Sequence, residues 1–171
     1  GTRATSTYKN PHGRGGVTII SSSVTGDSDP ATCVLGREVK NVKSQDAPQQ
    51  FFGVHLIKNR ALVTRYSIRH GAENGNFLRQ WKFEGSNDGV EWECLREHRN
   101  DKTLSSAGQS HTWEVSTTNA YSQFRVVTTG PNSNGTGILA MSGLELYGDM
   151  GDEHYGLPPT PHPTPVFGVF Q

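Results

Sequence analysis

A short stretch at residues 81–92 constrains the fold of this chain more than any other segment. Its first half alternates, with Trp81 and Phe83 on one face, and side chains of a β-strand alternate in this way. An Asn-Asp-Gly turn at residues 87–89 follows, and Asp-Gly readily adopts the positive φ angles of a tight turn. Trp92 then opens a returning segment. The stretch therefore predicts two antiparallel strands joined by a tight turn.

The rest of the chain repeats this pattern of short β-rich runs between turns. Together with the hairpin it predicts about eight strands, at irregular spacing typical of a sandwich or barrel. The expected strands are residues 17–20, 51–56, 63–69, 81–85, 92–96, 111–115, 124–128 and 144–147. The 20 Gly and 9 Pro favour turns, and no segment has sustained helical periodicity. We therefore expect an all-β, antiparallel β-sandwich.

The expected core is aromatic and aliphatic. Trp81 alternates with Phe83, so the tryptophans are interpreted as packing residues, although a sugar-stacking platform is the alternative. The predicted core residues are Trp81, Phe83, Trp92, Trp113, Leu144 and Leu146.

The two ends of the chain differ from its middle. Residues 1–16 are polar, glycine-rich and basic, and we expect an irregular lead-in arm before a sandwich that ends at residue 148. Residues 149–171 begin acidic, continue as an extended proline-rich stretch and end in an apolar run. This tail is interpreted as a linker toward another domain, or as a peptide that docks on the sandwich or on a partner.

Composition excludes several functions. The 16 basic and 16 acidic residues cancel, which argues against nucleic acid and anionic membrane surfaces as partners. No run of about 18 apolar residues occurs, so we expect no membrane span. The motifs of nucleophile elbows, phosphate-binding loops and dinucleotide sites are missing, so we expect no enzymatic activity in this chain. The two cysteines, Cys33 and Cys94, are either free thiols or one long-range disulfide.

Residues 86–92, Ser-Asn-Asp-Gly-Val-Glu-Trp, carry a family resemblance. They fit the Ser-x-Asp-Gly-x-x-Trp pattern between two strands that is typical of the discoidin (F5/8 type C, galactose-binding-like) superfamily. The longer stretch from Arg69 to Trp92, and the final Ser-Gly-Leu-Glu-Leu-Tyr-Gly at residues 142–148, resemble discoidin-like domains of intracellular HECT-type ubiquitin ligases and BTB-containing adaptor proteins. The DOC domain of the anaphase-promoting complex is a more distant likeness.

This resemblance implies a jelly-roll sandwich with ligand-binding loops at one end, in a cytoplasmic or nuclear protein with flanking domains. Relatives bind sugars, phospholipids or protein segments, and the fold does not choose among them. We expect a non-catalytic module that recognises a protein or peptide. A carbohydrate-binding module and a purely structural packing domain are the alternatives.

Candidate ligand contacts lie where strands run into loops. Arg69 and His70 suit an acidic or carbonyl-rich ligand, since arginine offers a bidentate fork. Alternatively, Arg69 pairs locally, for instance with Glu73, and His70 caps the turn. The amides and hydroxyl of Asn132, Ser133 and Asn134 suit a peptide backbone or a glycan, or serve only the turn.

No metal or cofactor is expected, with one weak exception. Asp27 and Asp29 are candidate calcium ligands, because hard oxygen ligands suit that ion. His98 and Asp101 are spaced i, i+3, which suits two metal ligands, but two ligands are too few, so a structural hydrogen-bond pair is expected.

Overall fold

The protein is described here by a computed structural model, which covers residues 16–26, 29–30, 35–152 and 164–167. The described residues form the strands β1 (Val17–Ser21), β2 (Val42–Lys43), β3 (Phe51–Leu56), β4 (Asn59–Arg69), β5 (Trp81–Ser86), β6 (Glu93–His98), β7 (Ser110–Glu114), β8 (Gln123–Thr128), β9 (Ala140–Met141), β10 (Gly143–Asp152) and β11 (Thr164–Phe167). Each predicted strand is present. The short strands β2 and β9 and the late strand β11 were not predicted, because two residues carry no readable periodicity and β11 lies in a proline-rich segment.

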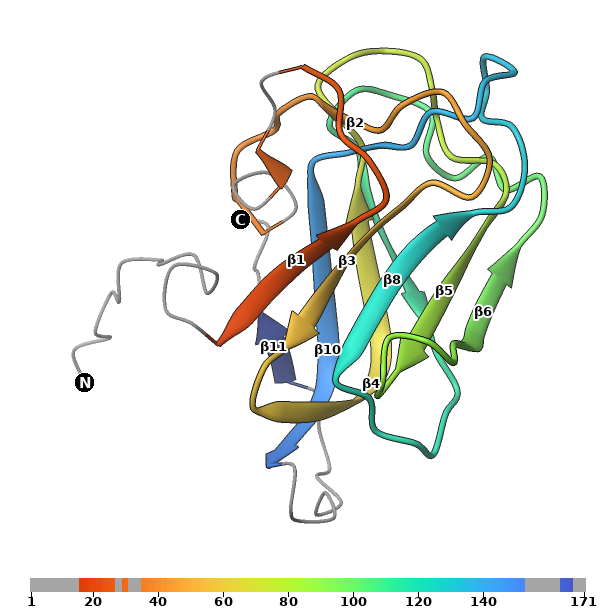
Figure 1. Cartoon of the computed structure of the whole chain (residues 1–171). Coiled ribbons are helices and arrows are strands. Elements are labelled where there is room, and N and C mark those ends of the chain that lie inside the picture. Colours follow the sequence, from red (N-terminus) through yellow and green to blue (C-terminus); the bar gives the residue numbers. More distant parts are fainter. Residues whose placement is uncertain (1–15, 27–28, 31–34, 153–163, 168–171) are drawn as a thin grey trace.

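Two antiparallel sheets form the sandwich (Figure 1). The five-stranded sheet has the order β1-β3-β8-β5-β6, and the four-stranded sheet has the order β11-β10-β4-β7. A two-stranded pair of β2 and β9 joins two long connections. The expected all-β, antiparallel β-sandwich is therefore confirmed.

The core lies between the sheets and follows the alternation of the strands. Phe52, Val54 and Leu56 face inward from β3 with at most 1% of their surface exposed. Across the core, the rings of Tyr66 and Phe83 stack with 4.0 Å between centroids. Burying large aromatic and aliphatic side chains supplies the main driving force for folding.

Most of the predicted core residues are buried, and one is not. Those with buried side chains in the core cluster are Trp81, Phe83, Trp113, Leu144 and Leu146. The placement of Trp92 in the core was wrong, since this side chain is only half-buried. The returning strand starts one position later, at Glu93, so Trp92 belongs to the turn and its ring lies against Arg125 on the outer face.

The antiparallel pairing gathers the long connections at one end of the sandwich, which we call the loop end (Figure 1). Its described segments are residues 22–26, 29–30, 35–50, 70–80, 99–109 and 129–142. The opposite end holds the connections at residues 57–58, 87–92 and 115–122. The predicted turn is present there, where Gly89 has a φ of 73° and the Asp88 carboxylate accepts hydrogen bonds from the N–H groups of Val90 and Glu91.

The last long strand passes the predicted domain end at residue 148. Strand β10 continues to Asp152, pairing with the first half of β4. The register shifts between Tyr147 and Gly148, where Gly148 has a φ of 157° and a Cβ would lie 2.0 Å from the Leu62 carbonyl oxygen. Strand β11 then pairs with β10, so part of the proline-rich tail adds a strand to the four-stranded sheet. A link from this tail to another domain stays a prediction.

Candidate functional site

The loop end does not offer the predicted Arg69 contact. This guanidinium is buried, with 5% of the residue exposed, and donates to the carbonyl oxygens of Gly36, Arg37 and Glu38 and to Ser142. Its distances to the three loop carbonyls lie between 2.6 and 2.9 Å. Arg69 therefore holds residues 36–38 against the end of β4 and is committed to the fold. The local partner considered for it, Glu73, instead pairs with Lys43.

His70 caps its turn, as the alternative interpretation held. Its Nε2 lies 3.1 Å from the Glu73 carbonyl oxygen and 2.9 Å from that of Gly75. The residue is 1% exposed, and burial lowers the pKa of the imidazole below its ordinary value. A neutral, buried imidazole that is hydrogen-bonded to two carbonyl oxygens of the turn stabilises that turn, so His70 does not face a ligand.

The polar loop at residues 132–134 also uses most of its hydrogen-bonding groups within the fold. Asn132 is buried, and its Nδ2 donates to Asn76, Thr136 and Ile138 oxygens. Ser133 and Asn134 are exposed, but both accept backbone N–H groups, from Phe77 and Asn76 respectively. The loop is therefore built by its own amides, and only its exposed rim is left for contact.

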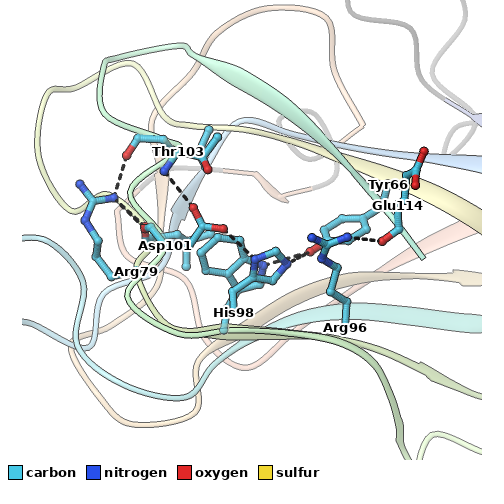
Figure 2. Close-up of polar contacts among 10 residues, drawn as sticks. Tyr66, Arg79, Arg96, His98, Asp101, Thr103 and Glu114 are labelled. Carbon is cyan, nitrogen blue, oxygen red and sulfur yellow. Dashed lines mark hydrogen bonds and ion pairs between the residues drawn. The ribbon is translucent and has the colours of Figure 1, made fainter. Parts of the chain in front are cut away.

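The pair predicted between His98 and Asp101 is confirmed and belongs to a longer chain of contacts (Figure 2). His98 Nδ1 lies 2.8 Å from Asp101 Oδ2, and Nε2 lies 2.7 Å from the Tyr66 hydroxyl. The Trp81 indole reaches that hydroxyl at 3.2 Å, and the Trp81 and His98 rings stack at 4.0 Å. The Thr103 N–H donates to the other carboxylate oxygen of Asp101 at 2.8 Å. We call Trp81, Tyr66, His98 and Asp101 the core relay.

The direction of donation in the core relay follows from its two ends. An indole N–H only donates, and an ionised carboxylate only accepts. Burial alone raises the pKa of Asp101, but hydrogen bonds from Thr103 and His98 outweigh it, so the pKa is lowered and the carboxylate is ionised. Burial lowers the pKa of His98, so the ring is neutral, with its proton on Nδ1 toward Asp101 and with Nε2 accepting from Tyr66.

A hydroxyl, imidazole and carboxylate in series also occur in enzymes, but here the hydroxyl and the imidazole are buried in the core. Tyr66 is 0% exposed and His98 is 4% exposed. Burial raises the pKa of the Tyr66 hydroxyl far above its ordinary value, so it stays protonated. The core relay therefore satisfies polar groups inside the sandwich and presents nothing to a substrate.

Two arginines near the core relay donate hydrogen bonds to backbone carbonyl oxygens (Figure 2). Arg79 Nη1 donates to the Leu104 carbonyl at 2.7 Å and to that of Leu78 at 2.8 Å. Arg96, on the edge strand β6, donates to the Glu114 carbonyl on β7 at 2.6 Å. Because β6 and β7 are edge strands of different sheets, this hydrogen bond of Arg96 connects the two sheets along one side of the sandwich.

A hollow of the described surface lies on the outer face of the five-stranded sheet, and we call it the sheet groove. Its volume is about 630 Å³. The floor is formed by outward-facing residues of β5 and β8, and the walls are formed by residues 46–49 and by residues 129–131 and 135–137. The floor residues are Lys82, Glu84, Arg125 and Val127, and Thr128 also lines the groove.

The two walls of the sheet groove are joined at one point. The Gly137 N–H donates to Asp46 Oδ1 at 2.7 Å. A Cβ on Gly137 would lie 2.4 Å from the Ala47 carbonyl oxygen, so only glycine allows the two backbones to approach this closely. This contact sets the width of the groove at that point.

The floor holds one guanidinium in a fixed position. Arg125 Nε donates to Glu84 Oε2 at 2.8 Å, from side chains that are 20% and 11% exposed. Its Cζ lies 4.0 Å from the centroid of the Trp92 ring and 5.1 Å from that of Phe51. Contacts with an aromatic face attract a cation, and an arginine held on several sides loses little entropy when it binds.

A smaller hollow of about 460 Å³ at the opposite end is acidic. Two of its three carboxylates are engaged: Asp88 accepts the turn N–H groups, and Glu93 accepts the Tyr121 hydroxyl. Among the described residues, no group of three or more His, Cys, Asp or Glu side chains is placed to hold a metal. Asp29 is exposed, while Asp27 lies outside the described residues, so the calcium site stays a prediction. Cys94 is a free, exposed thiol, and Cys33 lies outside the described residues.

Comparisons with known proteins support the resemblance seen in the sequence. No protein-family model matches the chain. The chain is 42% identical over 93 residues to the E3 ubiquitin-protein ligase hecd-1 of Caenorhabditis elegans, covering 52% of this chain and 4% of that protein. It is 33% identical over 118 residues to the E3 ubiquitin-protein ligase Ufd4 of Drosophila melanogaster, covering 63% and 4%. A BTB/POZ domain-containing protein of Arabidopsis thaliana is 35% identical over 96 residues, covering 53% and 12%.

Solved structures with the same fold include carbohydrate-binding modules. CBM32-3 from a family 31 glycoside hydrolase of Clostridium perfringens matches with a TM-score of 0.65 and 15% identity, covering 82% of this chain and 99% of that chain. The family 32 module of C. perfringens NanJ, in complex with galactose, matches with a TM-score of 0.61 and 16% identity, covering 76% and 92%. The chain therefore has the discoidin-type, galactose-binding-like fold and resembles segments of ubiquitin ligases and of a BTB protein. Within the described residues, no helix is long and apolar enough to cross a membrane.

Sequence reasoning missed the sheet groove. Lys82 and Glu84 were visible as the polar face of an alternating strand, and Arg125 as the polar residue of another. Their meeting depends on the pairing of β5 with β8, which places Glu84 opposite Arg125. Strand order is not readable from alternation, so the sequence alone carried no signal that joined them.

Proposed function

We propose that this chain is a non-catalytic protein-recognition module of a larger ubiquitin-ligase-type protein, and that the sheet groove is its recognition surface. The observation that carries the proposal is the charged floor of the groove, with Arg125 fixed in place and Lys82 beside it. The ligase relatives support a role in recognising a substrate or partner. Since the chain spans 4% of each ligase, flanking domains and a cytoplasmic or nuclear setting are part of the proposal.

The groove suits a polypeptide better than a sugar. Sugar sites commonly use an aromatic ring on which the apolar face of the sugar stacks, and the residues that line this groove include no aromatic side chain. The nearby Trp92 already has one face against Arg125, and Phe77 at the loop end lies between His70 and Arg79. A groove of about 630 Å³ with charged groups and wall backbones accommodates a short extended segment.

A charge reversal in the groove tests the proposal. Lys82→Glu changes a half-exposed floor residue, and the matched Lys58→Glu changes an exposed residue at the opposite end. Both variants are used as bait in extracts of the source organism, with captured proteins identified by mass spectrometry. The proposal expects specific partners that the Lys58 variant keeps and the Lys82 variant loses. Identical partner sets from both variants would move the function away from the groove.

A carbohydrate-binding module is the second candidate, favoured by the shared fold with the galactose-bound NanJ module. Calorimetric titration with galactose and N-acetylgalactosamine distinguishes the two, since the leading proposal expects no heat of binding. A structural packing role is the third candidate. In that case hydrogen exchange in the full-length protein would find the groove protected by flanking segments.

A further inference from the structure

The sheet groove contains cationic groups whose binding capacity is not used within the described part of the chain. The Lys82 ammonium has no ion pair or hydrogen-bond partner among the described residues. Arg125 uses only Nε, toward Glu84, so the N–H groups of its Nη1 and Nη2 atoms remain for a ligand. The floor therefore presents more unused donors than acceptors, although the formal charges of the whole chain cancel.

The register places these two cations close together. Lys82 lies opposite Val127, and Glu84 lies opposite Arg125, so Lys82 and Arg125 are diagonal neighbours on the same face of β5 and β8. Diagonal neighbours in an antiparallel pair are about 7–8 Å apart, within reach of long side chains. One carboxylate between them can accept a two-point hydrogen bond from the Nη atoms and an ion pair from the ammonium.

The acidic groups of the groove already accept hydrogen bonds from other residues that line it. Glu84 is 9% exposed and accepts from Arg125 Nε, so the Nη atoms of the guanidinium take no part in this hydrogen bond. Asp46 accepts the Gly137 N–H and joins the walls. The guanidinium of Arg125 lies over the Trp92 ring, with its Cζ 4.0 Å from the ring centroid. The carboxylates thus position the site, and the cations are the groups left to bind.

We infer that the sheet groove selects peptide segments that carry an aspartate or glutamate, and that Lys82 and Arg125 receive that carboxylate. The inference rests on the proposed function and names the chemistry of its ligand. The walls, formed largely by backbone and by small side chains at residues 129–131 and 135–137, contact the peptide on either side. Specificity then comes from one acidic position within an otherwise tolerant segment.

A phage-displayed random dodecapeptide library, selected on the 171-residue chain, provides the probe. Selection is repeated on Lys82→Gln, on Arg125→Lys, which keeps a cation for Glu84 but removes the fork, and on the distant Lys58→Gln. Thermal melts establish that each variant is folded. The inference expects enriched peptides with Asp or Glu at one fixed position on the wild type and on Lys58→Gln, and their loss on the two groove variants.

The strongest enriched peptide is then measured by fluorescence anisotropy beside its version with Gln or Asn at that position. Since hydrogen bonds to charged groups are the stronger ones, the neutral peptide is expected to bind about tenfold more weakly, or worse, and Lys82→Gln should reduce that difference. Peptides that require the groove but carry no acid would overturn the inference and leave the proposed function standing. Failure to enrich any groove-dependent peptide would overturn both.

Discussion

Removing the Tyr66 hydroxyl isolates the contribution of the core relay to stability. Tyr66→Phe keeps the ring that stacks on Phe83 but leaves the Trp81 N–H without an acceptor and His98 Nε2 without a donor. Each buried group left unsatisfied costs about 1–3 kcal/mol. Because both groups lie where water does not reach, we expect a loss of about 2–4 kcal/mol in the free energy of unfolding.

The assay is urea unfolding monitored by tryptophan fluorescence, with Tyr121→Phe as the matched control. Tyr121 donates its hydroxyl to the exposed Glu93 carboxylate, which water can solvate once the hydroxyl is gone. The control is therefore expected to lose less than about 1 kcal/mol. Equal losses for the two variants, or a loss below about 0.5 kcal/mol for Tyr66→Phe, would refute the reasoning.

Three further outcomes are expected. Burial lowers the pKa of His98 in the folded chain, so the unfolded chain binds more protons. The contribution of His98 to stability is therefore complete above the ordinary imidazole pKa of 6.5 and falls as the pH drops below it, which urea unfolding between pH 5 and pH 8 measures. Gly137→Ala places a Cβ 2.4 Å from the Ala47 carbonyl oxygen and should lower stability by about 1–3 kcal/mol in thermal melts, whereas Gly16→Ala, with open space around it, should change little. Arg125→Met leaves Glu84 without its cation and should cost about 1–3 kcal/mol, and a double-mutant cycle with Glu84→Gln should recover part of that loss.

The strands were readable from the sequence because each long one has a buried and an outward face. In β3 and β5 the alternation of large apolar residues is nearly complete, and a strand with one face in the core must show it. The misplaced Trp92 shows the limit of this signal. Aromatic character predicts burial, but one residue of uncertainty at a turn decides whether the side chain enters the core or lies on the outer face.

The candidate site was less readable, since composition does not reveal which polar groups the fold itself uses. Arg69, His70 and Asn132 have the chemistry of ligand contacts, yet each donates to or contacts carbonyl groups of the fold. For Arg69 these carbonyls come from a connection more than 30 positions away in the sequence. Such bonds satisfy buried backbone groups and depend on the path of the loops. The pairing of Arg125 with Glu84 depends on strand order in the same way.

Site-specific photo-crosslinking tests the central claim most directly. p-Benzoylphenylalanine is placed at the exposed Thr129 on the rim of the sheet groove, and at the exposed Thr118 at the opposite end as a control. The account predicts that illumination in extracts of the source organism couples a protein to position 129, that position 118 captures none of it, and that Lys82→Glu abolishes the product. Equal crosslinking at both positions, or loss of the product when galactose is added, would contradict the assignment of the groove to protein recognition.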